Sequence, residues 1–226
     1  MENIGYSINL NYTRPDKALV ELFRDIPVAN IDDCMNRTAA VDGAIRPVNR
    51  TPLLGTAFTV QVAEGDNLMF HKAMDLAQPG DVIVIDAGGA TNRAIFGSLM
   101  INYCKVRGIA GVIVDGAIRD YRELAELDFP VYAKGVTPNG PYKNGPGTIG
   151  KTISFGGKIV RPGDIIVGDE DGIIIIDPAQ AEELYKAAQG VIAKEASILD
   201  NILNNHSYVR PWVDEFLTKT GCTMES

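Results

Sequence analysis

Two apolar runs constrain the fold of this chain more than any other feature. The segments DVIVID (81–86) and IAGVIVDG (109–116) are apolar at nearly every position, as in strands that are covered on both faces of a sheet. The first is followed by a Gly-rich loop and then by the segment 94–108, which is helical at its C-terminal end, and the second by the start of another helix at 117–128. This alternation predicts an α/β domain with a partly parallel sheet.

Further elements are predicted on both sides of this central unit. They are helices at 15–25, at 28–37 and between Asp66 and Gln78, strands at 53–63 and 129–134, a turn-rich connection at 135–150, and short strands in TISFGGKIV, DIIVG and GIIIID. We therefore expect an α/β fold of mixed sheets with flanking helices.

A long helix is predicted from about 178 to 204, with Asp177 as N-cap and Pro178 as its first residue. An apolar stripe follows its length, through Leu184, Ala188, Val191, Ile198 and Ile202. Glu195 stands where this stripe calls for an apolar residue. Burying a lone carboxylate is costly, so Glu195 is either paired within the fold or directed into a site, its own or a neighbour's.

The organisation expected is one α/β domain at 1–204 and a C-terminal arm at 205–226. The arm carries Tyr208, Trp212 and Phe216. We expect it to pack on a neighbouring subunit.

Charge and apolar patterning exclude several classes of protein. The net charge of −8 argues against a nucleic-acid groove, which needs clustered Lys and Arg. No apolar stretch is long enough to span a bilayer, and no leader sequence is recognisable. The three cysteines form no CxxC pair, so we expect free thiols and a cytoplasmic location.

The hexapeptide VDGAIR occurs twice, at 41–46 and 114–119. The upstream copy continues into Pro47 and is interpreted as a turn. The downstream copy ends a buried strand and continues into Asp120. Because the segments before the two copies differ, we do not interpret them as a duplication.

The first candidate site is the stretch from Gly97 through Ser98 and Leu99 to Met100, at the start of a helix. The first amides of a helix lack intrahelical partners and attract anions such as a carboxylate. A glycine needed only for turn geometry is the alternative explanation.

The second candidate site is Arg119 and Asp120, which follow the second buried strand. Arginine can bind a carboxylate through two hydrogen bonds, and aspartate can hold a hard cation such as Mg²⁺. The alternative is an ordinary helix start with a solvated arginine. His71 has no second histidine one helical turn away and is interpreted as structural.

These stretches carry a resemblance to a known family. GDNLMFHKAMDLAQPGDVIVIDAGG, the GSLM helix start and RGIAGVIVDGAIRD resemble the 4-hydroxy-4-methyl-2-oxoglutarate aldolase family, which includes the regulator of ribonuclease activity A (RraA-like proteins). The resemblance extends from about Val28 to Asp177, and the upstream VDGAIRPV also fits it. It implies a swivelling β/β/α domain, assembled as a homotrimer or a pair of trimers.

The resemblance also implies an activity, namely metal-dependent (class II) aldol cleavage of 4-hydroxy-2-oxoacids to pyruvate, often with oxaloacetate decarboxylation. The cofactor implied is Mg²⁺ or Mn²⁺. Carried over to this chain, Gly97 to Met100 and Arg119 bind the pyruvyl group and Asp120 binds the metal. Glu195 matches a glutamate that an adjacent subunit contributes to the metal-bound waters.

This chain departs from the family at one position. The aldolases carry an acidic residue at a fixed spacing before Arg-Asp, and Ser98 occupies that position here. Serine supplies no charge and no base at neutral pH. We therefore expect decarboxylation to survive better than aldol cleavage. The alternative function is that of a non-catalytic acidic oligomer that inhibits a ribonuclease complex, as some family members do.

Overall fold

The two apolar runs form adjacent parallel strands at the centre of a mixed sheet. In the computed structural model, which describes residues 4–223, they are β4 (Asp81–Asp86) and β6 (Gly111–Ile118). Along β4, Ile83 and Ile85 face one hydrophobic core and Val82 and Val84 face another. Burial on both faces explains why the run has no polar alternation, as predicted.

Within residues 4–223, ten strands form the main sheet and two form a separate hairpin. The order across the sheet is β1-β8-β3-β4-β6-β7-β2, with β11 and β12 continuing from β3 and β5 beside β6. The remaining strands are β1 (Tyr6–Ile8), β2 (Arg46–Pro47), β3 (Leu53–Val62), β5 (Ala94–Phe96), β7 (Val131–Val136), β8 (Gly147–Ile149), β11 (Ile165–Gly168), β12 (Ile173–Ile176) and, in the hairpin, β9 (Ile153–Phe155) and β10 (Lys158–Val160).

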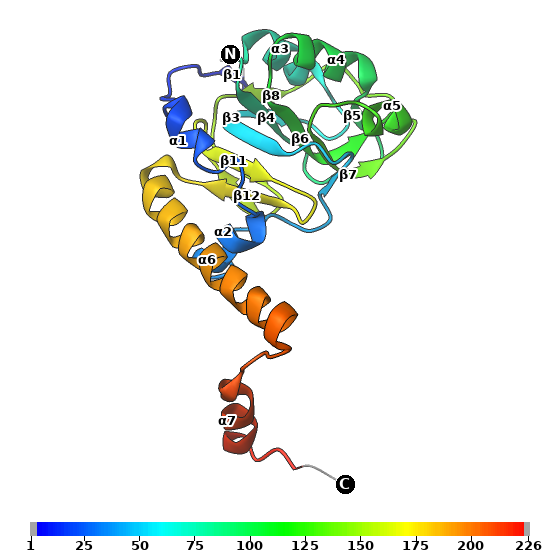
Figure 1. Ribbon diagram of the computed structural model, residues 1–226. Helices are drawn as coiled ribbons and strands as arrows, with labels where there is room; N and C mark the ends of the chain where they lie inside the picture. Colours follow the sequence, from blue (N-terminus) through cyan, green and yellow to red (C-terminus); the bar gives the residue numbers. More distant parts are fainter. Residues whose placement is uncertain (1–3, 224–226) are drawn as a thin grey trace. The chain divides into compact units, whose positions relative to one another are not determined.

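Helices cover one face of this sheet. α3 (Leu68–Leu76), α4 (Ser98–Val106) and α5 (Tyr121–Ala125) lie together there (Figure 1) and contribute buried side chains to the first core, among them Phe70, Ile101 and Leu124. The second core, on the opposite face, includes Phe155 and Val160 of the β9–β10 hairpin. The mixed α/β architecture expected from the sequence is confirmed.

The other helices are α1 (Lys17–Glu21), α2 (Val28–Cys34), α6 (Ala181–Asn205) and α7 (Pro211–Lys219). A single 3₁₀ turn at Pro178–Gln180 precedes α6, and the Asp177 carboxylate accepts a hydrogen bond from the Ala179 amide at 2.9 Å. The predicted cap of the long helix is therefore present. Within residues 4–223, no helix is both long and apolar enough to cross a bilayer.

The segment 94–108 is helical in its C-terminal part, α4, as predicted, and the strand β5 precedes this helix. Two other predictions were wrong. Arg46–Pro47 is not a free turn but the strand β2, paired with β7. The connection at 135–150 contains the strand β8. Each of these strands has two or three residues, too few to produce a periodic pattern.

The chain forms two compact units, Met1–Ala188 and Gln189–Ser226. All the buried residues among those described lie in the first unit. The second contains the rest of α6, α7 and the described part of the arm, and its side chains are exposed or half-buried.

The two VDGAIR copies meet in space although they are not a duplication. Lys134 Nζ lies 3.4 Å from Asp42 Oδ2 of the upstream copy and 3.2 Å from Asp115 Oδ1 of the downstream copy. The Gly156 amide donates to Asp115 Oδ2, and the Gly156 carbonyl accepts from the Asp42 amide. The aspartate of each copy therefore joins its segment to a shared ionic cluster.

Candidate functional site

Arg119 and Asp120 lie at the carboxyl end of β6, the edge at which open α/β sheets bind ligands. The Arg119 amide donates to the Phe96 carbonyl at 3.0 Å, which ties the pair to β5. Asp120 has left-handed backbone angles, φ 58° and ψ 38°. For a residue other than glycine this conformation costs on the order of 1 kcal/mol, and such strain is concentrated at functional sites.

The start of α4 lies against Asp120. The Ser98 amide donates to Asp120 Oδ2 at 3.0 Å, and Ser98 Oγ is 3.5 Å from the same oxygen. A Cβ on Gly97 would overlap Asp120 Oδ2, so only glycine allows the carboxylate to approach the helix this closely. The structure thus brings together the two candidate sites that the sequence suggested separately.

A pocket of about 320 Å³ opens beside this junction. Its lining residues are Asn67, His71, Phe96, Gly97, Leu99, Met100, Arg119, Asp120, Gly140, Pro141 and Lys143. The Arg119 side chain is 46% exposed, and its Nε is 3.8 Å from Asp120 Oδ2. This loose pairing leaves the guanidinium open to a ligand carboxylate.

Two predicted site residues do not line this pocket. Ser98 is buried and acts on Asp120 through its amide and hydroxyl. Glu195 is an exposed residue of α6 in the second compact unit. A contribution of Glu195 to a neighbouring subunit stays a prediction.

Three polar side chains of the lining were not predicted as site residues. His71 was interpreted as structural, and Asn67 and Lys143 were not candidates. Asn67 is 2% exposed, and its Nδ2 donates to the Ile95 carbonyl at 2.9 Å. Its Oδ1 is buried and has no hydrogen-bond partner among the described residues. Such an acceptor favours a ligand or water that donates to it.

Lys143 is positioned by a loop that is anchored on both sides of it. The Tyr142 amide donates to the Gly65 carbonyl at 2.8 Å, and the Asn144 amide donates to the buried Asp66 carboxylate at 2.6 Å. Arg93 adds hydrogen bonds to the Gly140 carbonyl at 2.9 Å and to the Tyr142 hydroxyl at 2.8 Å. The turn-rich connection is therefore an ordered wall of the pocket.

Partial burial lowers the pKa of His71, and the positive charge of Lys143 lowers it further, while Asp75 opposes both. Both side chains line the pocket. With a lowered pKa, His71 is uncharged at neutral pH, so the cations of the pocket are Lys143 and Arg119, beside the carboxylate of Asp120.

The donor set fits a magnesium-like ion. No group of three or more His, Cys, Asp or Glu side chains within residues 4–223 is arranged to hold a metal. Mg²⁺, however, commonly takes one or two protein carboxylates and keeps several waters. Asp120, half-exposed in the pocket, offers a carboxylate of this kind.

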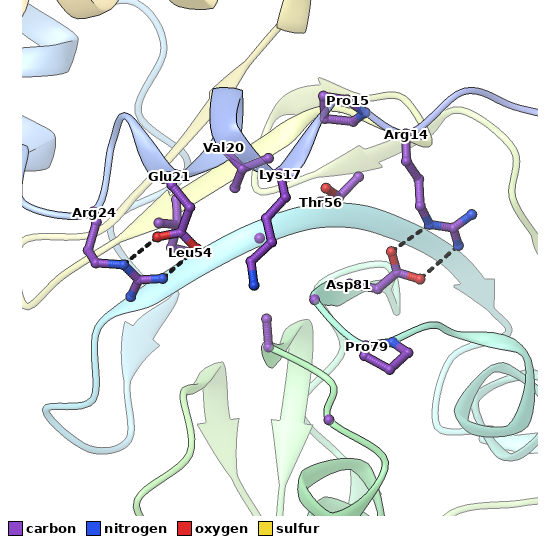
Figure 2. A pocket seen from close by; sticks show the side chains of 14 residues that line it. Arg14, Pro15, Lys17, Val20, Glu21, Arg24, Leu54, Thr56, Pro79 and Asp81 are labelled. Atoms are coloured by element: carbon purple, nitrogen blue, oxygen red, sulfur yellow. Dashed lines mark hydrogen bonds and ion pairs between the residues drawn. The ribbon is translucent and has the colours of Figure 1, made fainter.

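A larger pocket, of about 440 Å³, lies at the opposite end of β4 (Figure 2). Arg14 forms two hydrogen bonds of 2.8 Å with Asp81, and Arg24 forms two with Glu21. Lys17 extends between these pairs. Because both guanidinium groups are already matched by a carboxylate and the strands begin here, this pocket is the weaker candidate for catalysis.

Comparisons with known proteins identify relatives of this chain. A protein of Halalkalibacterium halodurans with the provisional name 4-hydroxy-4-methyl-2-oxoglutarate aldolase is 43% identical over 196 residues, which cover 84% of this chain and 93% of that protein.

Two solved structures share the fold. RraAS2 from Streptomyces coelicolor, described as an unusual member of the RNase ES inhibitor RraA protein family, has a TM-score of 0.73 and 26% identity over 81% of this chain and 97% of its own. The RNA-processing inhibitor RraA from Thermus thermophilis has a TM-score of 0.62 and 27% identity over 67% of this chain and 93% of its own.

The family model described as "RraA-like: Aldolase/RraA" matches residues 28–175, which include all of the pocket residues. The chain therefore belongs to the RraA-like family.

Proposed function

We propose that this protein is a lyase that releases pyruvate, by cleaving 4-hydroxy-2-oxoacids, by decarboxylating oxaloacetate, or by both. The observation that carries the proposal is the convergence of Arg119, strained Asp120 and the start of α4 in one pocket. The resemblance to the named aldolase of H. halodurans supports the same reaction class.

The residues of this chain would bind and orient the 2-oxoacid end of the substrate. Arg119 would bind the C1 carboxylate through charge-assisted hydrogen bonds. The amides of Leu99 and Met100 lie in the first turn of α4, where they have no intrahelical acceptor, and they favour the same negative group. Fixed donors of this kind stabilise the negative charge of the enolate that is left when the C–C bond breaks.

Asp120 would hold Mg²⁺ or Mn²⁺ in this site. When bound, the cation supplies Lewis-acid chemistry to the 2-oxo group. The contact of Ser98 with Asp120 orients the carboxylate but adds no charge. Aldol cleavage needs a base for the C4 hydroxyl proton, whereas decarboxylation does not, so decarboxylation should be the stronger activity.

We propose further that the working form is a homotrimer or a hexamer, in which Glu195 of a neighbouring subunit completes the site. The outer face of α4 supports this, because Leu99 and Val106 are each 84% exposed and lie with Tyr103 on one helical face. Apolar side chains of this kind beside a pocket favour a subunit contact.

The test is pyruvate release from oxaloacetate with Mg²⁺ and with EDTA. We expect metal-dependent release above the spontaneous rate, reduced at least about 100-fold in Arg119→Ala because an orienting charge is lost. Arg122→Ala removes an exposed arginine that does not line the pocket and should leave the rate unchanged. No metal-dependent release, or full activity of Arg119→Ala, would reject the lyase.

A second candidate is a non-catalytic inhibitor of a ribonuclease complex. The likeness to the two RraA structures and the net charge of −8 favour it. Pull-down against purified ribonuclease components separates the candidates, since an inhibitor should bind equally well with Arg119→Ala.

A further inference from the structure

The pocket at the amino end of β4 (Figure 2) is separate from the candidate active pocket, and the two share no lining residue. Its volume of about 440 Å³ is that of an ordinary small-ligand site. One wall is formed by the segment 14–24, which precedes the part of the chain that matches the family model, residues 28–175. A function of this pocket is therefore not implied by membership of the family.

Lys17 is the free cation of this pocket. Its side chain extends between the two ion pairs (Figure 2) and forms no hydrogen bond or ion pair with any residue from 4 to 223. The pKa of the Glu21 carboxyl is lowered first by its hydrogen bond with Arg24 and last by the charge of Lys17, one helical turn away. An ammonium group that lines a pocket without a partner favours an anionic ligand.

The other charged side chains leave the pocket with an excess of one positive charge. Arg14 is committed to Asp81, a carboxylate that is only 1% exposed. Arg24 pairs with Glu21, but these side chains are 60% and 36% exposed, and a pair this exposed contributes little to stability. With Lys17, three cations face two carboxylates, so a single negative charge would balance the pocket.

Apolar side chains surround these charges, namely Pro15, Val20, Leu54, Pro79 and Ala110. At Gly80, which has φ 89°, a Cβ would meet no atom within 4 Å, so the turn before β4 leaves this space open. Burial of a hydrocarbon chain against an apolar lining is favourable. The pocket therefore suits a ligand with one anionic group and an apolar body.

We propose that this pocket binds an amphipathic monocarboxylate, a small molecule with one carboxylate and a short hydrocarbon chain. Lys17 binds the carboxylate, and Arg24 assists by turning from its exposed partner. The chain lies against Leu54 and Ala110. Because the ligand joins α1 to the turn before β4, its binding stabilises the folded chain. This site is additional to the proposed lyase activity and does not depend on it.

The test uses three probes that separate charge from apolar contact. Hexanoate, acetate and hexan-1-ol are titrated calorimetrically into the full chain without divalent metal. We expect hexanoate to bind at least about tenfold more tightly than acetate, which lacks the chain, and than hexan-1-ol, which lacks the charge. Lys17→Met should weaken hexanoate binding about tenfold, and Lys17→Arg should retain it. Absence of hexanoate binding, or equal affinity for hexanoate and either other probe, would overturn the proposal.

Two control variants locate the bound carboxylate. Lys72→Met removes an exposed lysine of α3 that lines neither pocket, and Arg119→Ala removes the carboxylate-binding arginine of the candidate active pocket. We expect both variants to bind hexanoate as tightly as the parent. Loss of binding in Arg119→Ala would place the carboxylate in the other pocket, and equal losses in Lys72→Met and Lys17→Met would remove Lys17 from the site. Either result would overturn this assignment and leave the lyase proposal intact.

Discussion

Because position 98 is a serine and not an acidic residue, Asp120 has no second carboxylate beside it at the start of α4. Its amide and hydroxyl both approach Asp120 Oδ2, at 3.0 and 3.5 Å. An aspartate at the same position would stand at the first residue of α4, where the helix dipole favours negative charge. It would also place a second carboxylate beside Asp120, and the combined charge would attract a divalent cation more strongly.

The first prediction is that Ser98→Asp raises Mg²⁺ affinity about tenfold and increases the ratio of aldol cleavage to oxaloacetate decarboxylation. Without metal, repulsion between the introduced carboxylate and that of Asp120 should lower the melting temperature, and Mg²⁺ should restore it by binding the folded state. Ser98→Asn is the uncharged control. Identical Mg²⁺ affinities in the two variants would refute the electrostatic explanation of this position.

Asp86, beside Asp115 of the ionic cluster, makes the stability of the fold depend on pH. Burial raises its pKa, Asp115 on the neighbouring strand raises it further, and the hydrogen bond from the Gly88 amide, 3.0 Å long, opposes them. The folded protein therefore takes up this proton more readily than the unfolded chain. Lowering the pH through the raised pKa stabilises the fold through Asp86, and ionisation at neutral pH costs stability.

The second prediction is that Asp86→Asn raises the melting temperature at pH 7, by about 2–4 °C for each 1 kcal/mol relieved. Asparagine keeps an acceptor for the Gly88 amide without carrying the buried charge. The advantage over the parent should shrink as the pH falls toward the ordinary range of carboxylates, because the parent then becomes protonated. Asp25→Asn, at an exposed position, should lack this trend. A constant difference at every pH would contradict the role given to Asp86.

Some residues of the site could be predicted from the sequence and others could not, for a physical reason. Arg119 and Asp120 could be predicted because they follow a buried strand, and Gly97 because it precedes a helix. Lys143 could not, since its place depends on a loop that folds back onto Asp66. Asn67 was hidden for a similar reason, because only the packed structure shows that its Oδ1 has no donor.

At the scale of elements, the loop that carries Gly140 and Tyr142 depends on Arg93. Two hydrogen bonds join Arg93 to this loop, and its guanidinium stacks 4.0 Å from the Tyr142 ring centroid. Asp66 anchors the loop independently through Asn144. Loss of Arg93 should therefore loosen the pocket wall without unfolding it.

The third prediction is that Arg93→Ala raises the KM for oxaloacetate about three- to tenfold and changes kcat less than twofold. The expected cause is a looser pocket wall. Hydrogen exchange should detect it as faster exchange of the amides at 137–143, with exchange of the β4 and β6 amides unchanged. Arg122→Ala again provides the control. A fall in kcat at constant KM would mean that Arg93 acts on the chemistry and not on the wall.

Long strands could be predicted from the sequence, and very short ones could not. The runs that became β4 and β6 were identified because six to eight successive positions share burial on both faces. β2 and β5 have only two and three residues, and pairing with β7 and β6 gives them their extended form. Such contacts between distant parts of the chain leave no local periodicity.

At the scale of the whole molecule, the part of the second compact unit that the structure describes, residues 189–223, has no core of its own. Among its described residues none is buried, and α7 exposes Trp212 and Phe216 on one helical face, with Tyr208 exposed just before it. A helical segment this short is marginal in water without packing. We therefore propose, in line with the sequence expectation, that the arm at 205–226 packs on a second copy of this chain.

The last prediction uses Trp212, the only tryptophan of the sequence, which is 64% exposed in the single chain. If the arm is covered in the assembly, Trp212 emission should be blue-shifted and protected from acrylamide. Dilution should shift the emission to the red at the concentration where sedimentation reports dissociation. Phe216→Ala removes an apolar contact on the same face and should move that midpoint to higher concentration, whereas Thr218→Ala should not. If Trp212 in the intact oligomer emits like a solvent-exposed tryptophan, assembly proceeds without the arm.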